Sequence, residues 1–385
     1  MNVWQTLLIS LATIVIVVCL VNARRIYNLR NIPDKKDLEE QIDQLGTDFL
    51  RGNEHANIVI GIIKHGQKYV KGFGNESGLP SPDQSTLFEV PELAKLFTTT
   101  CLISLANQNS VSLDDNIRDY LPAGKKLAEH VSDTTLMHLA THTSGFPFMP
   151  EEVKRKNRDL IQPYRDIRKS DVWEYLLLCT EKCRPGIFKK SDIGISLLAY
   201  LLEEKTGLTF SELVQREICA PLKMKNTTAQ ISDDLKKQLV QGYGPTGNKE
   251  DFWHSGAFYG AGAIYTNMED ILLFLDAHIH SRDDLISQTL VGTHKRFSEN
   301  GAVSWMTARE YEKTFGLKDI LWIGGRTAGF SSYLAIDTKE KNAAAIIASA
   351  GIPTDKFGAY LMHILRRTSF AEVTPGILPA NNKNR

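Results

Sequence analysis

The sequence predicts an α/β (α+β) fold in which strands from both ends of the chain form one antiparallel sheet, flanked by helices. Residues 57–74 contain two β-rich runs, and residues 331–350 contain two more, joined by a polar turn at 339–341. The stretch between these runs carries mostly helical patterns of apolar residues. Strands at both ends with helices between them indicate a single sheet with a helical subdomain inserted across it.

The N-terminal elements of this fold are a helix and a hairpin. Residues 37–50 space their apolar side chains at helical intervals, which predicts a helix. The runs NIVIGIIKHG and QKYVKGFG follow, and their composition predicts two strands that turn at residues 65–67.

The later elements follow from the same patterns. Broad apolar faces predict helices over residues 172–183 and 195–208, and Gly207 is suited to end the second of these. The runs SSYLAIDT and NAAAIIASA predict two strands near the C-terminus. A last helix is expected over residues 355–367, before a Pro, Asn and Lys tail that we expect to be disordered.

The first residues predict a membrane anchor. Residues 3–21 are mostly apolar and are close to the roughly 20 residues that a helix needs to cross a bilayer. A cleaved signal peptide is the alternative, but no Lys or Arg precedes the apolar run. We therefore divide the chain into an anchor (1–23), a basic and polar stalk (24–37), a globular domain (38–370) and a tail (371–385).

Composition excludes several classes of function. The 385 residues include 45 Lys or Arg and 45 Asp or Glu, so no basic field indicates a nucleic-acid partner. Walker-type phosphate loops and HExxH zinc motifs are absent from the sequence, and we expect no cofactor and no metal. Five cysteines do not indicate a disulfide scaffold, and Cys179 and Cys183 lack the neighbours that would complete a tetrahedral metal site.

Several stretches together carry a family resemblance. They are TLFEVPELAKLFTTTCLISL, SVSLDDNIRDYLP, TLMHLATHTSGFP, the long segment from PGIFKKSDIG to LKMKNT, YGAGAIYTNMEDILLFL and IGGRTAGFSSYLAID. In this order, from about residue 38 to about residue 367, the chain resembles the serine β-lactamase-like superfamily. The resemblance is to class C β-lactamases and to the related penicillin-binding proteins, DD-peptidases and esterases, and it implies the β-lactamase/transpeptidase-like fold.

The resemblance implies acyl transfer as the family chemistry. A serine attacks a carbonyl, a lysine three residues later on the same helix face helps to remove its proton, and a tyrosine assists. Backbone N–H groups stabilise the oxyanion that forms.

In this sequence, most of the catalytic residues that the family carries on these helical segments are replaced. Aligned on the resemblance, Glu92 stands at the position of the nucleophilic serine, and Lys95 is retained. The tyrosine of the Y-x-N motif falls on Lys190, and its asparagine falls on Asp192, with Ser191 between them. The sequence contains no S-x-x-K motif elsewhere.

The third motif of the family, K-T-G or H-x-G, is degenerate as well. It becomes Ile323, Gly324 and Gly325, so an aliphatic side chain replaces a cationic or imidazole one, and Arg326 follows. Residues 205–207 spell K-T-G, but they end a predicted helix, and we interpret this match as a coincidence.

A glutamate suits the nucleophile position poorly, because its charge lies where a developing oxyanion must be stabilised. The substitution fits a structural role better. We expect Pro91 to be the first helical residue and Glu92 to lie in the first turn, where the helix dipole favours an acid. Glu92 is then expected to pair with Lys95, and Lys190 to join that pair.

Two histidines in MHLATHTSG, His138 and His142, have the spacing of metal ligands on a helix. They lie within a stretch that is structural in the family, and no acidic ligand motif accompanies them. We therefore interpret both as structural residues.

Our first hypothesis is a membrane-anchored, catalytically inactive relative of β-lactamases that binds a cell-wall-like fragment, a peptide or a protein partner. The ligand-binding residues are then expected to be Glu92, Lys95, Lys190, Ser191, Asp192, Gly324, Gly325 and Arg326. The first alternative is an unconventional hydrolase or transferase that uses Glu92 and Lys95. The second is a membrane-tethered scaffold, like the filament-forming mitochondrial member of the family.

The sequence gives two opposite indications of the membrane side. Five basic residues follow the apolar run within the stalk, so the positive-inside rule favours the cytoplasm for the globular domain. The resemblance implies the extracytoplasmic side, where this family usually works.

Overall fold

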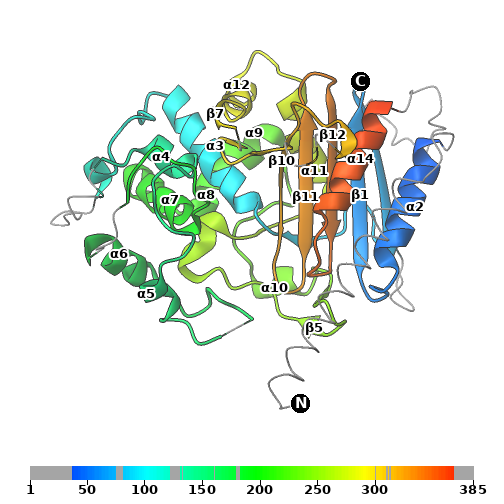
Figure 1. Cartoon of the computed structure of the whole chain (residues 1–385), viewed down its shortest axis with the longest axis horizontal. Helices are drawn as coiled ribbons and strands as arrows, with labels where there is room; N and C mark the ends of the chain where they lie inside the picture. The colour runs from blue at the N-terminus through cyan, green and yellow to red at the C-terminus, as the bar shows by residue number, and fades with distance from the viewer. Residues whose placement is uncertain are drawn as a thin grey trace, which may run out of the picture.

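The protein folds around one eight-stranded antiparallel sheet with a helical region beside it (Figure 1). The computed structural model describes residues 37–74, 81–121, 131, 133–159, 161–178, 183–299, 301–308, 311 and 314–367. The strand order is β2-β1-β12-β11-β10-β9-β8-β7. The strands of this sheet are β1 (Asn57–Lys64), β2 (Gln67–Gly74), β7 (Arg296–Ser298), β8 (Gly301–Ala302), β9 (Met306–Thr307), β10 (Leu321–Arg326), β11 (Ser331–Asp337) and β12 (Asn342–Ala348).

Strands from the two ends of the chain pair within this sheet, which confirms the predicted α/β fold. β1 pairs with β12, so that Ile60 lies opposite Ile346. The predicted hairpin is also confirmed, and its turn residues His65 and Gly66 both have positive φ, as the twist of a tight hairpin requires.

Helices cover both faces of the sheet. α2 (Leu38–Leu50) and α14 (Asp355–Arg367) pack on one face, and α11 (Met268–Ile279) packs on the other. Side chains along the central strands alternate between the two resulting cores: Ile58, Ile60 and Ile62 belong to the first, Val59 and Ile63 to the second. Burial on both faces explains why residues 58–63 of β1 contain no polar side chain.

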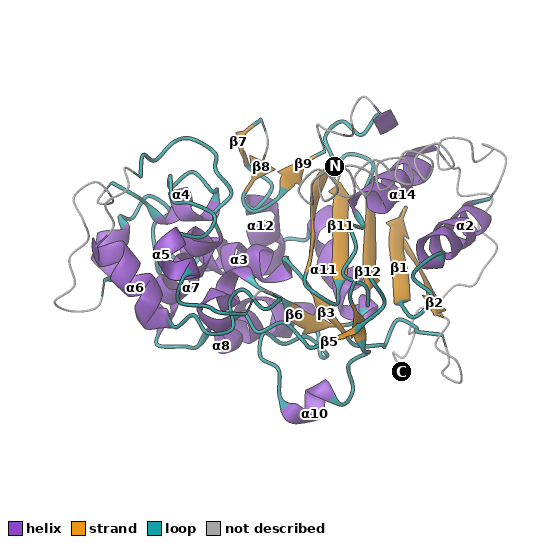
Figure 2. Ribbon diagram, turned by 60° about the horizontal axis from the view of Figure 1, so that its bottom comes forward, coloured by secondary structure: helices purple, strands orange, loops and turns teal. Residues whose placement is uncertain are grey.

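The helical region lies beside the sheet in both ribbon views and holds the two helices that build the candidate site (Figure 2). They are α3 (Leu93–Asn107) and α7 (Asp192–Thr206), and α7 ends at Gly207, which has φ +69° as predicted for a helix end. The other helices are α4 (Leu136–Ala140), α5 (Glu151–Lys154), α6 (Lys169–Leu178), α8 (Phe210–Val214), α9 (Ala220–Leu222), α10 (Asp233–Lys236) and α12 (Leu285–Gly292). The short helical turns are Ile117–Tyr120, Gln215–Cys219 and Gly256–Ala261.

Two small sheets complete the fold. β3 (Phe88–Val90) pairs with β6 (Ile264–Thr266), and β4 (Gly242–Tyr243) pairs with β5 (Lys249–Glu250). β3 is followed after two residues, Pro91 and Glu92, by α3.

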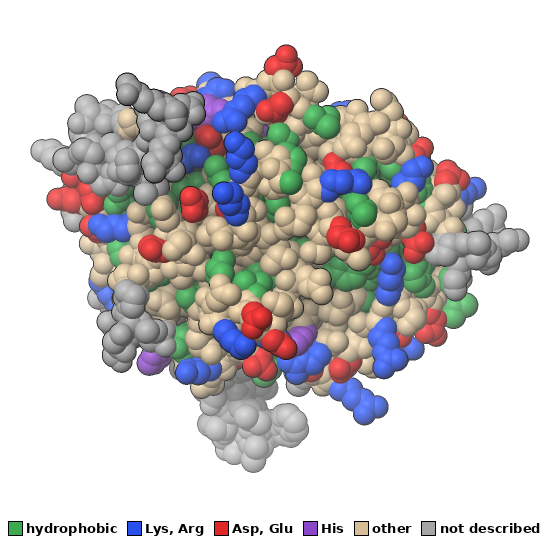
Figure 3. Space-filling view, turned by 180° about the vertical axis from the view of Figure 1, so that it is seen from behind, with side chains coloured by type: hydrophobic (Ala, Val, Ile, Leu, Met, Phe, Trp, Pro, Cys, Tyr) green, Lys and Arg blue, Asp and Glu red, His purple; other side chains and the backbone are tan. Residues whose placement is uncertain are grey.

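Several predicted features lie outside the described residues: the anchor (1–23), nearly all of the stalk (24–37), the tail (371–385) and Cys179. Within the described part of the chain, no helix combines the length and the apolar character needed to cross a bilayer. Cys101, Cys183 and Cys219 are buried free thiols. On the rear face, basic and acidic side chains are interspersed, in keeping with a net charge of zero (Figure 3).

Candidate active site

The candidate site begins where β3 turns into α3. α3 starts at Leu93, so the expectation that Pro91 is its first residue, with Glu92 in the first turn, is wrong. Glu92 instead immediately precedes the helix with a left-handed backbone (φ +66°, ψ −17°). This conformation costs a non-glycine residue about 1–2 kcal/mol. The side chain of Glu92 does not cap the helix and is therefore available for other contacts.

The Glu92 carboxylate is bound by the ammonium group of Lys95. Both carboxylate oxygens lie 2.8 Å from Lys95 Nζ, in the i, i+3 pair that the spacing predicts. α3 is buried on almost every side, and the Lys95 side chain is only 2% exposed. A lysine buried to this extent is stable only with anionic partners.

The second anionic partner comes from α7. Asp192 Oδ1 lies 2.6 Å from Lys95 Nζ, and the Asp192 side chain is 3% exposed. The other oxygen, Oδ2, accepts a hydrogen bond of 2.7 Å from the hydroxyl of Tyr164. Asp192 is held in place because the preceding Ser191 caps the helix: its hydroxyl accepts from Gly194 N and donates to the carbonyl of Pro147.

Lys190 completes the cluster from the solvent side. Its Nζ lies 3.0 Å from Glu92 Oε2, and its side chain is 47% exposed. The structure thus brings together four of the predicted residues, Glu92, Lys95, Lys190 and Asp192, as a charge-balanced set of two lysines and two carboxylates.

The environment of this cluster shifts the pKa values of its two carboxyl groups in opposite directions. Burial alone would raise the pKa of Glu92, but Lys95 and Lys190 together lower that pKa to about 2. Burial raises the pKa of Asp192, which has one lysine partner and lies near the Glu92 charge. Although burial opposes it, the two carboxylates raise the pKa of Lys95 above its ordinary value. Near neutral pH, Glu92 is therefore a carboxylate and Lys95 is an ammonium ion.

β10 contributes the third side of the site, and its residues alternate between the two faces of the sheet. A Cβ atom added to Gly325 would lie 2.3 Å from Glu92 Cγ, so this glycine packs directly against the Glu92 side chain. A Cβ on Gly324 would instead meet Ser332 O at 2.8 Å and Asp355 Oδ1 at 3.2 Å, away from the cluster. Ile323 is buried in the apolar core, and Arg326 is exposed at the end of the strand.

Both histidines of the MHLATHTSG stretch accept hydrogen bonds from backbone N–H groups. His138 Nδ1 accepts a hydrogen bond from Thr135 N at the start of α4. His142 is buried, and its Nδ1 accepts a hydrogen bond of 3.2 Å from Ser191 N, which fixes the loop before α7. Burial and the nearby lysine charges lower the pKa of His142 to about 3, so the ring is neutral. Among the described residues, no group of three or more His, Cys, Asp or Glu side chains has the arrangement of a metal site.

The sequence motifs did not identify two residues of the site. Tyr164 stacks on Phe258, with 4.5 Å between ring centroids, and donates to Asp192. Phe148 places its ring 5.9 Å from Lys95 Nζ. Tyr164 and Phe148 lie in loops without a recognisable spacing to the motifs, so only the folded chain shows that they contact the cluster. The K-T-G match at 205–207 ends α7 at the opposite end from Asp192 and takes no part in the site.

The chain matches known proteins over nearly the whole globular part. The Beta-lactamase family model matches residues 42–366. The D-alanyl-D-alanine-carboxypeptidase/endopeptidase AmpH of Escherichia coli is 23% identical over 365 residues, which cover 89% of this chain and 91% of that protein. A β-lactamase of Providencia stuartii is 21% identical over 247 residues, or 63% of this chain and 60% of the relative.

Solved structures share the fold. A β-lactamase/D-alanine carboxypeptidase from Pseudomonas syringae superposes with a TM-score of 0.71 at 20% identity, covering 86% of this chain and 98% of that one. A class C β-lactamase from Rhodobacter sphaeroides gives a TM-score of 0.70 at 20% identity, with 84% and 97% covered. The chain therefore belongs to the β-lactamase family and has the fold of class C β-lactamases.

Proposed function

We propose that this member of the family is a catalytically inactive protein that uses the degenerate site for binding. One observation carries the proposal: where the resemblance implies an attacking serine, the Glu92 carboxylate binds Lys95 through both of its oxygens at 2.8 Å. Glu92 at the nucleophile position and Lys95 at the base position therefore bind each other.

The charge states argue against acyl transfer by this cluster. A general base needs a pKa near the working pH, whereas the pKa of Glu92 is held at about 2 by two cations. Lys95 cannot accept a proton while its pKa is raised by two carboxylates. In addition, Lys190 and Ile323 replace residues that the family uses in the same step. Because such residues act as a unit, the loss of several leaves little residual rate.

The surface that remains can bind a ligand without converting it. Glu92 is 18% exposed and Lys190 is 47% exposed, and Phe148 is half-exposed beside them. With Arg326 at the end of β10, these side chains offer charged and aromatic contacts to a peptide, a cell-wall-like fragment or a protein partner. Ser191 and Asp192 are buried beneath this surface and help to hold its side chains in position.

Membrane attachment through residues 1–23 is part of the proposal and is supported by the apolar run at 3–21. Protease protection of the full chain, in sealed vesicles whose cytoplasmic face points outward, tests the membrane side of the globular domain. A protected globular domain would indicate the extracytoplasmic side, and a digested one the cytoplasmic side that the basic stalk favours. Release of the chain by a carbonate wash would contradict the anchor.

The absence of catalysis is tested by incubating the full chain with fluorescent penicillin and with a fluorogenic ester, beside a class C β-lactamase as the positive control. We expect no covalent label and no turnover by the chain. A label or a turnover rate that disappears in Glu92→Ala would overturn the proposal in favour of an unconventional hydrolase. Sizing of the same sample detects filaments, which would favour a scaffold.

A further inference from the structure

A second charged feature lies outside the candidate active site, between α5 and α6. It is an open hollow of about 630 Å³ on the loop that joins these helices. Its lining consists of Lys156, Arg158, Arg165, Asp166, Arg168, Ser170 and Asp171. A volume of this size falls within the range of small-molecule sites in proteins.

The hollow lies in a basic segment of an otherwise neutral chain. Residues 154–171 contain seven Lys or Arg and three Asp, although the whole chain has equal numbers of basic and acidic residues. The space-filling view shows Lys and Arg side chains at its lower right, on the side of the molecule where α5 and α6 lie (Figure 3). This concentration of positive charge creates a local field that attracts anions.

The carboxylates of Asp166 and Asp171, which line the hollow, accept hydrogen bonds from backbone N–H groups of the loop. Asp171 Oδ2 accepts a hydrogen bond of 2.8 Å from Arg168 N, and Asp166 Oδ2 accepts one of 3.4 Å from Arg158 N. Neither forms an ion pair with the guanidinium groups of Arg158 and Arg168. In the described part of the chain, these two guanidinium groups have no anionic partner, whereas Arg165 pairs with Asp159 at 2.9 Å.

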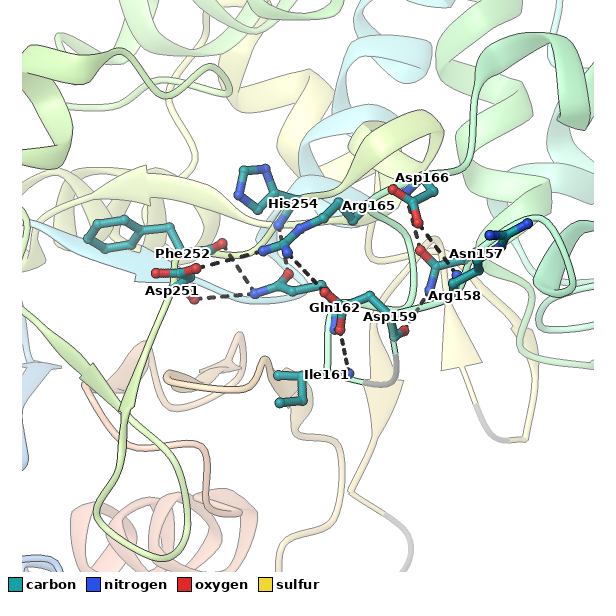
Figure 4. A network of polar contacts seen from close by, with 10 residues as sticks. All are labelled: Asn157, Arg158, Asp159, Ile161, Gln162, Arg165, Asp166, Asp251, Phe252 and His254. Atoms are coloured by element: carbon teal, nitrogen blue, oxygen red, sulfur yellow. Dashed lines mark hydrogen bonds and ion pairs between the residues drawn. The ribbon is translucent and has the colours of Figure 1, made fainter.

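Hydrogen bonds hold the described part of the loop against a neighbouring segment. Gln162 is buried and bridges two segments: its Nε2 lies 3.3 Å from the carbonyls of Asp251 and Phe252, and its Oε1 accepts from His254 N (Figure 4). In the same view, the guanidinium group of Arg158 points away from this network. Such hydrogen bonds reduce the entropy that the loop loses when a ligand binds.

We propose that this hollow binds a phosphate-type oxyanion through Arg158 and Arg168. The planar fork of a guanidinium group matches the oxygens of a phosphate and forms two parallel charge-assisted hydrogen bonds. The first turn of α6, which begins at Lys169, also lines the hollow through Ser170. The site does not depend on the function proposed above, because it shares no residue with the Glu92 cluster.

The phosphate has two possible sources, a soluble polyphosphate-type metabolite and the headgroup of an anionic lipid. Both are tested by titrating the full chain, in a neutral detergent, by calorimetry. The probes are inorganic pyrophosphate, short-chain phosphatidic acid and, as the uncharged-headgroup control, short-chain phosphatidylcholine. Because the contacts are ionic, we expect the affinity to fall as salt is added.

The variants are Arg158→Gln with Arg168→Gln, and a matched control, Arg155→Gln with Arg282→Gln. The control removes two exposed arginines that do not line the hollow, and one of them lies in the same basic segment. We expect the first pair to weaken binding by about tenfold for each guanidinium lost and the control pair to leave it unchanged. Thermal unfolding of each variant shows that the fold is kept.

Each result of these titrations either supports the oxyanion site or contradicts it. Binding of pyrophosphate that depends on the two arginines supports a soluble ligand. Binding of phosphatidic acid alone supports a lipid headgroup. The proposal is overturned if no probe binds at millimolar concentration, if phosphatidylcholine binds as well as phosphatidic acid, if the control pair weakens binding equally, or if neither pair weakens it.

Discussion

The Lys95 ammonium group lies 2.6 Å from Oδ1 of Asp192, and both side chains are almost completely buried. Lys95 thereby links the start of α3 to the start of α7, and Glu92 binds its other side. Lys95, at the position where the resemblance implies a lysine that assists proton transfer, is the centre of an ion-pair cluster in this chain.

Removal of the central cation should be far more harmful than removal of the outer one. Lys95→Met leaves the buried Asp192 carboxylate and the partly buried Glu92 carboxylate without their shared partner, and we expect the free energy of unfolding to fall by about 3–5 kcal/mol. Lys190 is half-exposed, so Lys190→Met should cost at most about 1 kcal/mol. Denaturant unfolding measures both values. Addition of Asp192→Asn to Lys95→Met should restore part of the loss, and no restoration would contradict this explanation.

We expect a glycine to be required at position 325 because the Glu92 side chain packs directly against it. Gly325→Ala places a Cβ atom 2.3 Å from Glu92 Cγ, and we expect a loss of about 1–3 kcal/mol. In a Glu92→Ala background, the γ carbon is absent and the same change should cost little. A double-mutant cycle measures the difference, and additive costs would mean that the two residues do not pack together.

Stability should depend on pH through Glu89 on β3. This buried carboxyl accepts hydrogen bonds from Thr327 Oγ1 at 2.6 Å and from Trp253 N at 2.7 Å, but burial dominates and raises its pKa to about 7. Between the unfolded pKa of about 4.3 and the folded value, the native state binds more protons than the unfolded state. Stability should therefore fall as the pH rises through this interval.

The control for this effect is Glu89→Gln, which cannot ionise. The stability of the native chain relative to Glu89→Gln should decrease by roughly a few kcal/mol between about pH 4.5 and pH 7 and then level off. Denaturant titrations at a series of pH values give this difference. A difference that stays constant, or that grows in favour of the native chain with rising pH, would contradict the raised pKa.

Restoring the serine should not restore catalysis. In Glu92→Ser, Lys95 still pairs with Asp192, and Lys190 and Ile323 still replace the tyrosine and the third-motif residue of the family. We expect no labelling by fluorescent penicillin, as in the Glu92→Ala control. Labelling of the serine variant alone would show that the rest of the site remains competent.

The sequence predicted the main elements because their patterns are local. The hairpin of β1 and β2, the end of α7 at Gly207 and the last helix all follow from periodicity and turn residues within short windows. The i, i+3 pair of Glu92 and Lys95 is local as well, so its contact followed from the spacing alone.

The rest depends on long-range packing. Glu92 has a left-handed backbone next to two long-range contacts: β3 pairs with β6, and the Ser332 hydroxyl donates to the carbonyl of Pro91 at 2.7 Å. Tyr164 reaches Asp192 from a loop 28 residues earlier in the chain. Such contacts leave no periodic signal, and the sequence therefore predicted which residues share the site better than it predicted how the site is held.

The central claim is that Glu92 is a carboxylate bound to Lys95 and does not attack carbonyl groups. Attack on an activated ester would form an acyl anhydride at Glu92 and release the alcohol of the ester; hydroxylamine attack on the Glu92 carbonyl would then release the acyl group as a carboxylate and leave a hydroxamate on this side chain. The direct measurement is peptide mapping by mass spectrometry of the full chain after incubation with an activated ester and hydroxylamine. We predict that the peptide containing Glu92 keeps its unmodified mass, and a hydroxamate at residue 92 would contradict the claim.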